Sequence, residues 1–508
     1  MTQMVFRERN IVRKNAQKVD VLFGYCYPST YRTGMTSLST HLFYTILNGR
    51  EDTSCERYFR YDVPSASFSL ESGRPLKENH VVGFSLTYEE NITEILEMLA
   101  RGQIPLLAKN RRVEDPIVLV GGAVATSNPE PYHDFVDAFV IGEGDEVIHD
   151  IIEAVRNANS RNEAIDNLAD IEGLYVPSTA PSVVRRIQIE DLDSSPYPEA
   201  QIIPNVADGS KYEPIFGKAF LLETSRGCGH ACGFCLIGHL CRPRRIRSLD
   251  VLQRLVERGL EKTPVRKIAL IASSLGERDN VEELTSWIVS QGLNLSVPSL
   301  RADTVNPNLL SAVVAGGQRT LTIAPETGSE ELRQQIGKGL TDNEIFRAIS
   351  LAEEAGFTSV KLYFIVGLPH ETEQDVEAIV RLVKNIAEKS RIEIKVNVNP
   401  FVPKAGTRYQ RHPQPTLDIL RKKTGVVTNG LNRIPNVVCT TLDVRAARIQ
   451  AALSLGDQNL SEVIRLATKY GGYGGWRRAE AESGIEFFSV ANDAERLKGD
   501  LPWSFIKS

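Results

Sequence analysis

The sequence predicts an α/β protein in three parts: a doubly wound, Rossmann-like parallel sheet, a partial (β/α)6 barrel and a mostly helical C-terminal region. Short apolar segments alternate with amphipathic helical segments in two separate stretches, and a stretch rich in turn residues lies between them. The alternation stops near residue 402, and helical patterns follow. We therefore expect domains at residues 1–160, 218–402 and 403–508, with a linker at 161–217.

The first stretch contains four apolar segments that predict strands, at residues 19–24, 81–86, 117–120 and 135–141. Helices are expected at 36–47, 92–99 and 146–157, and Pro28 is expected to end the first strand. Parallel sheets of this kind bind ligands at the carboxyl ends of their strands, where glycine lets the backbone approach a bulky ligand. The candidate ligand residues at these ends are Ser85, Thr87, Tyr88, Gly121, Gly122, Thr126, Gly142, Glu143 and Gly144.

The stretch from 161 to 217 differs in character from its neighbours. Residues 174–176 and 183–187 are expected to pair as small strands. Prolines and other turn residues at 194–198 and 204–214 predict a linker long enough to fold the first domain back over the second.

The second stretch predicts six βα units. Strands are expected at 219–223, 267–272, 294–298, 320–324, 360–366 and 392–399, with helices at 249–259, 281–290, 308–315, 343–355 and 373–388. Six such units suggest an open barrel with its active residues at the carboxyl ends of the strands.

The C-terminal part predicts helices at 416–434 and 443–469 and a strand at 437–441. Residues 470–478 form an aromatic and basic, glycine-rich stretch. It is expected to be flexible, either as a lid that contacts substrate or as a connecting loop.

Composition narrows the classes of protein. The net charge of −5 gives no basic surface for nucleic acid, and no run of apolar residues is long enough to span a membrane. The first thirteen residues have no apolar core of a signal peptide. Seven cysteines, three of them clustered, argue against a disulfide framework, so we expect a cytoplasmic protein.

The clustered cysteines are Cys228, Cys232 and Cys235, in a loop that follows the first barrel strand. Three thiolates leave one iron of a four-iron cluster without a protein ligand, and an open coordination position indicates a catalytic metal centre. The alternatives are buried hydrophobic cysteines or a zinc site, with a fourth ligand from Cys241, His230 or His239.

The CxxxCxxC spacing with the aromatic Phe234 before its last cysteine resembles the signature of the radical S-adenosyl-L-methionine (SAM) superfamily. The segments APETGSE (324–330) and KLYFIVGLPHETEQD (361–375) are similar to segments of its cobalamin-binding members. The glycine pair at 121–122 and the GEGD at 142–145, ahead of the cysteine motif, resemble the cobalamin-binding domain of cobalamin-dependent radical SAM enzymes. No D-x-H-x-x-G motif supplies a histidine to cobalt, so Tyr88 or a neighbour is the candidate lower-face contact.

The resemblance implies three cofactors: a 4Fe-4S cluster on the three cysteines, SAM at its free iron, and cobalamin against the first domain. The other four cysteines are then expected to stay off the cluster. Polar residues at the other barrel strand ends are candidates for SAM, whose carboxylate, ammonium, ribose and adenine all need partners. Arg301 is the candidate for the carboxylate, Ser274 and Glu326 for ribose or ammonium, and backbone near Gly367 for adenine. Each of these residues has an alternative role in a local cap or loop hydrogen bond.

The resemblance further implies a methyltransferase that C-methylates an unactivated carbon, supplied with electrons by an external donor. In such an enzyme the strand ends of the first domain must face the barrel mouth, so that both cofactors flank one substrate carbon. No residue of the sequence identifies the substrate. The resemblance to this class of enzymes alone suggests a carbon of a protein substrate, such as a glutamine of methyl-coenzyme M reductase. The alternatives are a radical SAM cyclase, carbon–carbon coupling enzyme or methylthiotransferase, or a non-catalytic sensor. No second cysteine triad is present for the auxiliary cluster of a methylthiotransferase.

Overall fold

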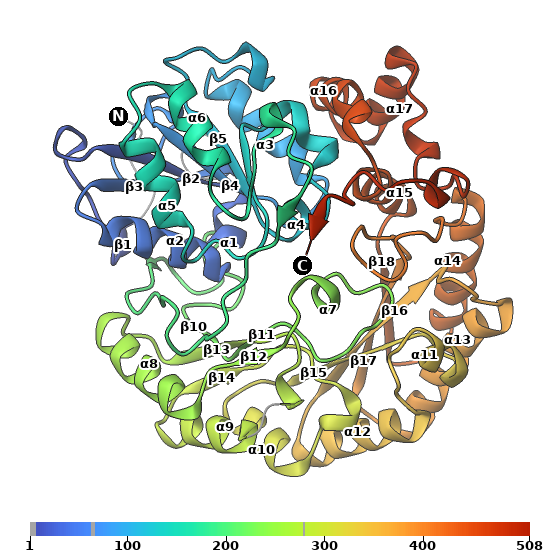
Figure 1. Ribbon diagram of the computed structural model, residues 1–508. Coiled ribbons are helices and arrows are strands. Elements are labelled where there is room, and N and C mark those ends of the chain that lie inside the picture. Colours follow the sequence, from blue (N-terminus) through green and yellow to red (C-terminus); the bar gives the residue numbers. More distant parts are fainter. Residues whose placement is uncertain (1–6, 62–66, 278–279, 508) are drawn as a thin grey trace.

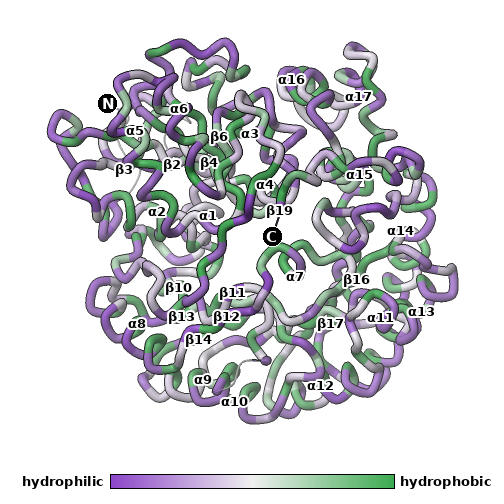
Figure 2. Tube along the Cα trace, viewed as in Figure 1, coloured by the Kyte–Doolittle hydropathy of each residue, from purple (hydrophilic) through white to green (hydrophobic). Residues whose placement is uncertain are grey.

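The structure, a computed structural model, describes residues 7–61, 67–277 and 280–507, so the first six residues of the predicted N-terminal domain lie outside the described residues. Figure 1 shows the N-terminal sheet (blue to cyan) and the C-terminal helices α15–α17 (red) together above the barrel (green to orange). In Figure 2, hydrophobic colour runs along strands of both sheets, and hydrophilic colour is common on the outer helices and loops. No helix of the described residues is both long and apolar enough to cross a membrane.

Six strands form the N-terminal sheet in the order β3-β2-β4-β5-β6-β7, and all neighbours are parallel except β6 and β7. The order reverses between β2 and β4, and open α/β sheets bind ligands at such a reversal. The bounds are β2 (Val21–Thr30), β3 (Thr53–Tyr61), β4 (Val81–Ser85), β5 (Ile117–Gly121), β6 (Ala138–Val140) and β7 (Leu174–Tyr175).

Helices cover both faces of this sheet, which confirms the doubly wound architecture. One face packs on α2 (Leu38–Gly49), α5 (Ile148–Arg156) and α6 (Arg161–Ala169). The other packs on α3 (Asn91–Arg101) and on three helices from the far end of the chain. These are α15 (Val444–Ser454), α16 (Ser461–Tyr470) and α17 (Gly472–Ser483), so the C-terminal region completes the N-terminal domain.

Two predictions for the first 217 residues are wrong, and one strand has no prediction. Pro28 lies inside β2, where the pairing with β3 shifts register between Tyr27 and Thr30, so its missing N–H costs no ladder bond. Strand β3 has no counterpart among the predicted strands. The two small strands of the linker do not pair with each other: β7 extends the N-terminal sheet beyond residue 160, and β8 (Val184–Arg185) pairs with β19 (Ile506–Lys507).

The barrel is one strand longer than predicted. An isolated bridge between Leu300 and Ile323 joins the sheet β10-β13-β14 to the sheet β15-β16-β17-β18, all parallel. The strands are β10 (Phe220–Glu223), β13 (Lys267–Ile271), β14 (Asn294–Ser296), β15 (Thr320–Glu326), β16 (Ser359–Val366), β17 (Glu393–Pro400) and β18 (Val437–Thr441). Because β18 pairs with β17, the barrel sheet continues past the predicted boundary at 402.

The barrel helices lie close to the predicted positions. They are α8 (Leu249–Lys262), α9 (Val281–Ser290), α10 (Pro307–Ala315), α11 (Glu330–Gln335), α12 (Asp342–Ala355), α13 (Glu373–Lys389) and α14 (Leu417–Leu431). Their inner faces and the strands share one core of buried aliphatic residues.

The stretch 470–478 is not a flexible loop. It belongs to the end of α16 and to α17, and Trp476 is buried and stacks on Phe487 with 4.7 Å between ring centroids. The glycines of this stretch gave a local signal for a loop, but burial of the tryptophan against a distant aromatic residue outweighs it.

Candidate functional site

The carboxyl ends of the two sheets face each other. Arg226, in the short strand β11 (Ser225–Arg226) just before the cysteine loop, binds Asp145 at 2.8 Å and Glu143 at 3.1 Å in the N-terminal domain. Arg245 of β12 (Arg245–Ile246) binds Glu143 at 2.7 Å. A second connection joins Lys404, beyond β17, to the buried Glu89, beyond β4. The expectation that the first domain's strand ends face the barrel mouth is confirmed.

The three clustered cysteines lie on one loop between β11 and α7 (Ile237–Leu240). Cys235 Sγ accepts a hydrogen bond from the Gly238 N–H at 3.4 Å, and Cys232 Sγ lies 3.5 Å from the Gly337 carbonyl. Gly233 packs against the Tyr409 ring, and the Tyr409 N–H donates to the Gly233 carbonyl at 3.0 Å. The loop is thus held from the loop after α11 and from residues beyond β17, with its thiols on one short arc.

The pKa values of two of the thiols depend on burial, on the neighbouring thiols and on two cations. The pKa of Cys232 is raised to about 11, chiefly by burial; Cys235 and Glu326 contribute to the rise, while Lys338 and Arg301 oppose it. Burial also raises the pKa of Cys235, and Cys228 adds to that effect. Three cysteines on one loop can supply three thiolates, and iron ligation compensates the cost of burying their negative charge. The donor set fits a cluster held by three cysteines.

The proposed zinc ligands are engaged elsewhere. His230 Nε2 contacts Glu277, and His239 is bonded to the Cys235 carbonyl at 2.7 Å and to the Arg408 N–H at 3.2 Å. Burial raises the pKa of Cys241, and its charged neighbours are Glu143 and Arg245, among others, rather than the clustered cysteines. Among the described residues, no three His, Cys, Asp or Glu side chains are placed to hold a single metal ion.

Hydroxyl groups without partners lie at the barrel mouth. Ser274, just beyond β13, is 4% exposed, and its Oγ has no hydrogen-bond partner among the described residues. The same holds for Ser225 Oγ beyond β10 and Thr327 Oγ1 beyond β15. Buried polar groups are normally hydrogen-bonded, so three orphaned hydroxyls at neighbouring strand ends fit a polar ligand such as SAM. Ser274 therefore stays a candidate for SAM.

Glu326 and Arg301 are placed near the cysteines but already have partners. Glu326 ends β15 with φ of 72°, a strained backbone that is often found at functional sites, and its carboxylate binds Lys338 at 3.1 Å. Arg301 donates to Asp303 at 2.8 Å and to the Lys338 carbonyl at 3.0 Å. Lys338 thus links both predicted residues, although sequence reasoning missed it; the only local signal is its place in a Gly-Lys-Gly turn.

Of the two remaining residues predicted in the barrel, Gly367 has its N–H bound within the chain, whereas Phe234 faces a cavity. The Gly367 N–H donates to Glu371 at 2.7 Å, and its φ of 88° together with close packing on Leu420 explains the glycine. This N–H is therefore not free for adenine. Phe234 packs on buried residues such as Phe401 and lines a cavity at the centre of the molecule.

The glycines and polar residues of the N-terminal strand ends mostly serve the protein itself. Gly122 and Gly142 have φ of 111° and 117°, and a Cβ there would meet the Leu86 and Ile187 carbonyls at 2.7 and 2.0 Å. Thr126 Oγ1 accepts from the Gly142 N–H at 3.0 Å. Glu143 binds Arg226 and Arg245 in an interdomain ion pair, and its contact with a cofactor stays a prediction.

The remaining predicted residues of this domain are less constrained. Gly144 lies close to the Phe43 ring, whereas a Cβ at Gly121 would meet only Val140 at 3.6 Å. Ser85 ends β4 and is half-buried, Leu86 is buried, and Thr87 and Tyr88 are exposed. Thr87, Tyr88 and Gly121 therefore form the open part of this edge, at the reversal of strand order.

A cavity of about 460 Å³ lies between the two domains. Tyr88 lines it from the N-terminal domain, Phe234 and Glu326 from the cysteine loop and β15, and Lys404 and Gln450 from the C-terminal region. Its size suits a small ligand. Lys404 and Gln450 were missed from the sequence because each is an isolated polar residue in a stretch without a motif.

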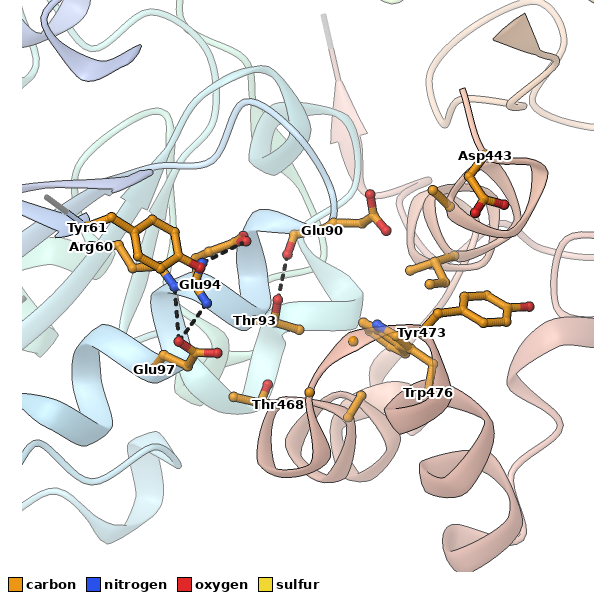
Figure 3. A pocket seen from close by; sticks show the side chains of 15 residues that line it. Arg60, Tyr61, Glu90, Thr93, Glu94, Glu97, Asp443, Thr468, Tyr473 and Trp476 are labelled. Carbon is orange, nitrogen blue, oxygen red and sulfur yellow. Dashed lines mark hydrogen bonds and ion pairs between the residues drawn. The ribbon is translucent and has the colours of Figure 1, made fainter. Parts of the chain in front are cut away.

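A second cavity of about 320 Å³ is drawn in Figure 3. Figure 3 shows the carboxylates of Glu90, at the start of α3, and of Glu94 and Glu97 on one side, with Asp443 and the rings of Tyr473 and Trp476 on the other. The two cavities are walled by neighbouring residues of the same segments, such as Leu442 and Asp443. Glu94 and Glu97 bind Arg60 at 3.4 and 2.7 Å.

Two family models match the chain and together cover more than half of it. "Radical SAM proteins, N-terminal" matches residues 39–177, and "Radical SAM superfamily" matches residues 222–383. The chain therefore belongs to the radical SAM superfamily, whose members use a 4Fe-4S cluster and SAM.

Relatives in archaea extend this result. The uncharacterized protein MJ0966 of Methanocaldococcus jannaschii is 31% identical over 86% of this chain and 89% of its own length. The uncharacterized methyltransferase PH0819 of Pyrococcus horikoshii is 27% identical over 55% of this chain and 60% of its own. The putative methylthiotransferase MJ0865 of M. jannaschii is 28% identical over 59% of this chain and 63% of its own.

Two solved structures share the fold. The radical SAM methyltransferase TsrM of Kitasatospora setae, solved with cobalamin and a 4Fe-4S cluster, superposes with a TM-score of 0.51 at 14% identity, covering 74% of each chain. The cobalamin-dependent radical SAM enzyme OxsB, solved with aqua-cobalamin and SAM, gives a TM-score of 0.52 at 15% identity, covering 92% of this chain and 72% of its own. At this identity the likeness concerns the fold alone.

Proposed function

We propose that this protein is a cobalamin-dependent radical SAM methyltransferase that methylates an unactivated carbon of a substrate bound between its two α/β domains. The observation that carries the proposal is the shared cavity, lined on one side by Tyr88 at the strand reversal of the N-terminal sheet and on the other by Phe234 and Glu326. Two cofactors bound at these edges would both reach one substrate atom.

The chain supplies position and polarity around the cofactors. Cys228, Cys232 and Cys235 would hold the cluster, and Lys338 and Arg301 place positive charge beside it. Ser274, with its unpartnered hydroxyl, would hold SAM together with Glu326. Residues 85–88 and Gly121 would contact cobalamin, with Tyr88 on its barrel side. When bound, the cluster and SAM supply a radical that removes a hydrogen from the substrate, and cobalamin supplies the methyl group.

The protein positions these groups by two direct links. Glu143 and Asp145 fix Arg226, two residues before Cys228, and Glu89 fixes Lys404 at the cavity wall. The buried apolar residues around the cavity, such as Phe364 and Phe401, exclude water from a reactive centre. We place the protein in the cytoplasm, with an external one-electron donor, since all seven cysteines are free thiols.

A second candidate is a methylthiotransferase, which the similarity to MJ0865 favours. Such an enzyme needs ligands for an auxiliary cluster. The remaining cysteines do not offer them as a group: Cys26 and Cys55 are buried in the N-terminal sheet, Cys241 lies beside Glu143, and Cys439 is in β18. This distribution favours the methyltransferase.

The test is the fate of SAM in the anaerobically reconstituted protein. For any substrate that is turned over, one methylation should consume two SAM molecules and yield one 5′-deoxyadenosine and one S-adenosylhomocysteine. Mass spectrometry with SAM deuterated at its methyl group measures both coproducts and the label in the product. Turnover that yields deoxyadenosine without S-adenosylhomocysteine would exclude methyl transfer through cobalamin.

A further inference from the structure

The central cavity contains a buried polar atom that the protein leaves without a partner. Gln450 of α15 is 4% exposed and lines the cavity, and its Nε2 makes no hydrogen bond of normal geometry among the described residues. Burial, with Glu90 and Glu89, raises the pKa of the nearby Tyr88, and a contact between its hydroxyl and the Gln450 amide opposes this. That contact falls short of hydrogen-bond geometry, so Tyr88 does not satisfy the amide N–H groups. An unsatisfied buried donor destabilises a fold, and each one in a native protein needs an explanation.

A neighbouring glutamine shows what a structural role looks like. Gln414 is 3% exposed, and its Nε2 donates to the Phe401 carbonyl at 2.7 Å and to the Ala447 carbonyl at 3.1 Å. Ala447 and Gln450 lie on the same helix. The amide nitrogen of Gln414 therefore binds the backbone, whereas that of Gln450, equally buried beside the cavity, makes no such bond among the described residues.

A second donor lines the same cavity. The Lys404 ammonium carries three N–H groups and is bound by Glu89, which is 2% exposed and fixes its position. The carboxylate of Glu326, also on the cavity wall, is occupied by Lys338. Most of the remaining wall is apolar, with large residues such as Phe364 and Phe401, although Asn399 and two tyrosines also line it. Two donors in an apolar cavity call for an acceptor on an apolar ligand.

We propose that Gln450 and Lys404 form the substrate subsite of this cavity and bind a carboxylate or amide carbonyl oxygen at the end of an apolar group. The inference rests on the proposed function, because it assigns the cavity to the substrate rather than to a cofactor. It adds a substrate class, an apolar chain that carries an oxygen acceptor. It also gives the C-terminal region a role, since α15 supplies the residue that selects the substrate.

Three probes of equal chain length test this subsite in the protein loaded with cluster and cobalamin: hexanoate, hexanamide and hexylamine. Saturation-transfer NMR titrations should show hexanoate and hexanamide binding at least fivefold more tightly than hexylamine. Gln450→Leu should abolish that preference. Gln450→Glu keeps the shape but presents only acceptors, so it should weaken hexanoate most.

Stability and cofactor content give readouts that do not depend on any reaction. Gln450→Leu should leave the Tm unchanged or raise it, whereas the matched Gln414→Leu should lower it by several degrees. Iron and cobalamin content should stay at the wild-type level in Gln450→Leu. Unchanged probe affinities, a fall in Tm equal to that of Gln414→Leu, or loss of either cofactor would each overturn the proposal. Probe binding involves no methyl transfer, so failure of the subsite and failure of the proposed reaction are distinguishable.

Discussion

The two carboxyl edges that meet at the centre of this protein differ in how their polar groups are used. At the N-terminal edge, Glu143, Asp145 and Thr126 are bound by other residues of the chain. At the barrel edge, the hydroxyls of Ser225, Ser274 and Thr327 are buried and have no hydrogen-bond partner within the described part of the chain. The first edge is therefore largely built as an interface, and the second is built to receive a polar ligand.

This difference changes how a motif should be interpreted. The GEGD of residues 142–145 has the look of a ligand loop, yet its acids hold the strand that leads into the cysteine loop. Its resemblance to a cofactor-binding segment remains compatible with cobalamin at residues 85–88 and Gly121. In this chain the motif aligns two domains, and alignment is what a shared cavity requires.

The largest effect is expected at the cysteine loop. Replacing Cys228, Cys232 or Cys235 by alanine removes one of three thiolates and should abolish nearly all cluster iron after anaerobic reconstitution. Cys241→Ala is the matched control, because this thiol lies among Glu143 and Arg245, and it should retain iron. Equal loss of iron in Cys241→Ala and Cys232→Ala would replace the three-ligand site by a closed four-thiolate site.

The interface itself should respond to Glu143→Gln. Removing the buried carboxylate leaves Arg245 without its ion-pair partner, which should lower the free energy of unfolding by about 3 kcal/mol. Burial by itself would raise the pKa of Glu143, but Arg245 and Arg226 bind its carboxylate and hold the pKa below its ordinary value. The carboxylate therefore contributes its full stabilisation above the pKa of the unfolded chain, and this stabilisation is lost as pH falls through the pKa of the folded protein. Denaturant unfolding at pH 7 and pH 3.5 measures this: the free energies of unfolding of wild type and Glu143→Gln should become more similar at the lower pH.

Glu146→Gln is the control for this interface, since Glu146 is exposed and lies one residue beyond the GEGD. It should change the unfolding free energy by less than about 0.5 kcal/mol. An equal loss in both variants would mean that the ion pair does not join the domains.

The N-terminal edge can be probed for a ligand with two adjacent glycines. Gly122→Val forces a branched residue to φ of 111° and onto the Leu86 carbonyl, so it should destabilise the domain whether or not cobalamin binds there. A Cβ at Gly121 would meet only Val140 at 3.6 Å, so the fold should tolerate Gly121→Val far better than Gly122→Val while cobalamin retention falls. The absorbance of bound cobalamin, divided by the iron content of the same sample, measures how much cobalamin each variant retains. Full retention in a stable Gly121→Val protein would remove this strand end from the site.

Ser274→Ala tests the barrel edge. If the hydroxyl binds SAM, the variant should weaken SAM binding by about 1 kcal/mol, roughly fivefold in Kd, and leave stability unchanged because no protein hydrogen bond is lost. Thr285→Val is the contrasting variant: its hydroxyl is equally buried but donates to the Val281 carbonyl at 2.9 Å, so stability should fall and SAM affinity should not. Equilibrium dialysis with SAM decides, and unchanged SAM affinity in Ser274→Ala would return the serine to a structural role.

The sequence predicts the local parts of this structure better than its long-range contacts. Helix 281–290 was placed at its observed bounds, and the strand expected at 360–366 is β16 (Ser359–Val366), because each has a strong hydrophobic pattern. The cysteine motif likewise lies within eight residues.

What was missed depends on residues far apart in the chain. Lys404 and Glu89 are 315 residues apart, and Gln450 becomes conspicuous only when its buried amide is seen without a partner. Helices α15–α17 pack on the N-terminal sheet. Their amphipathic sequences indicate that one face of each helix is buried, but not which part of the protein that face covers. Glycines at 471–475 favour a loop by propensity, and only the buried Trp476 reveals the helix.

A further effect is expected at the second cavity, where the comparison of used and unused polar groups predicts a pH dependence. Burial raises the pKa of Glu90 to about 7, and Glu94, Glu89 and Asp443 add to this, while Lys404 opposes it. The folded protein then binds more protons than the unfolded chain between the ordinary pKa of 4.5 and about 7, so stability falls as pH rises through that window and is level above it. Glu90→Gln lacks this loss and should be more stable than wild type by about 1–2 kcal/mol at pH 8, allowing for partial exposure, with no gain at pH 4.5. Glu97→Gln breaks an ion pair with Arg60 and should be less stable than wild type at pH 8. Denaturant unfolding of the three proteins at both pH values measures the effect. A Glu90→Gln protein that is no more stable than wild type at pH 8 would show that this carboxylate is solvated or paired in solution. The polar groups of the second cavity would then be satisfied by the chain itself, like those of the N-terminal edge.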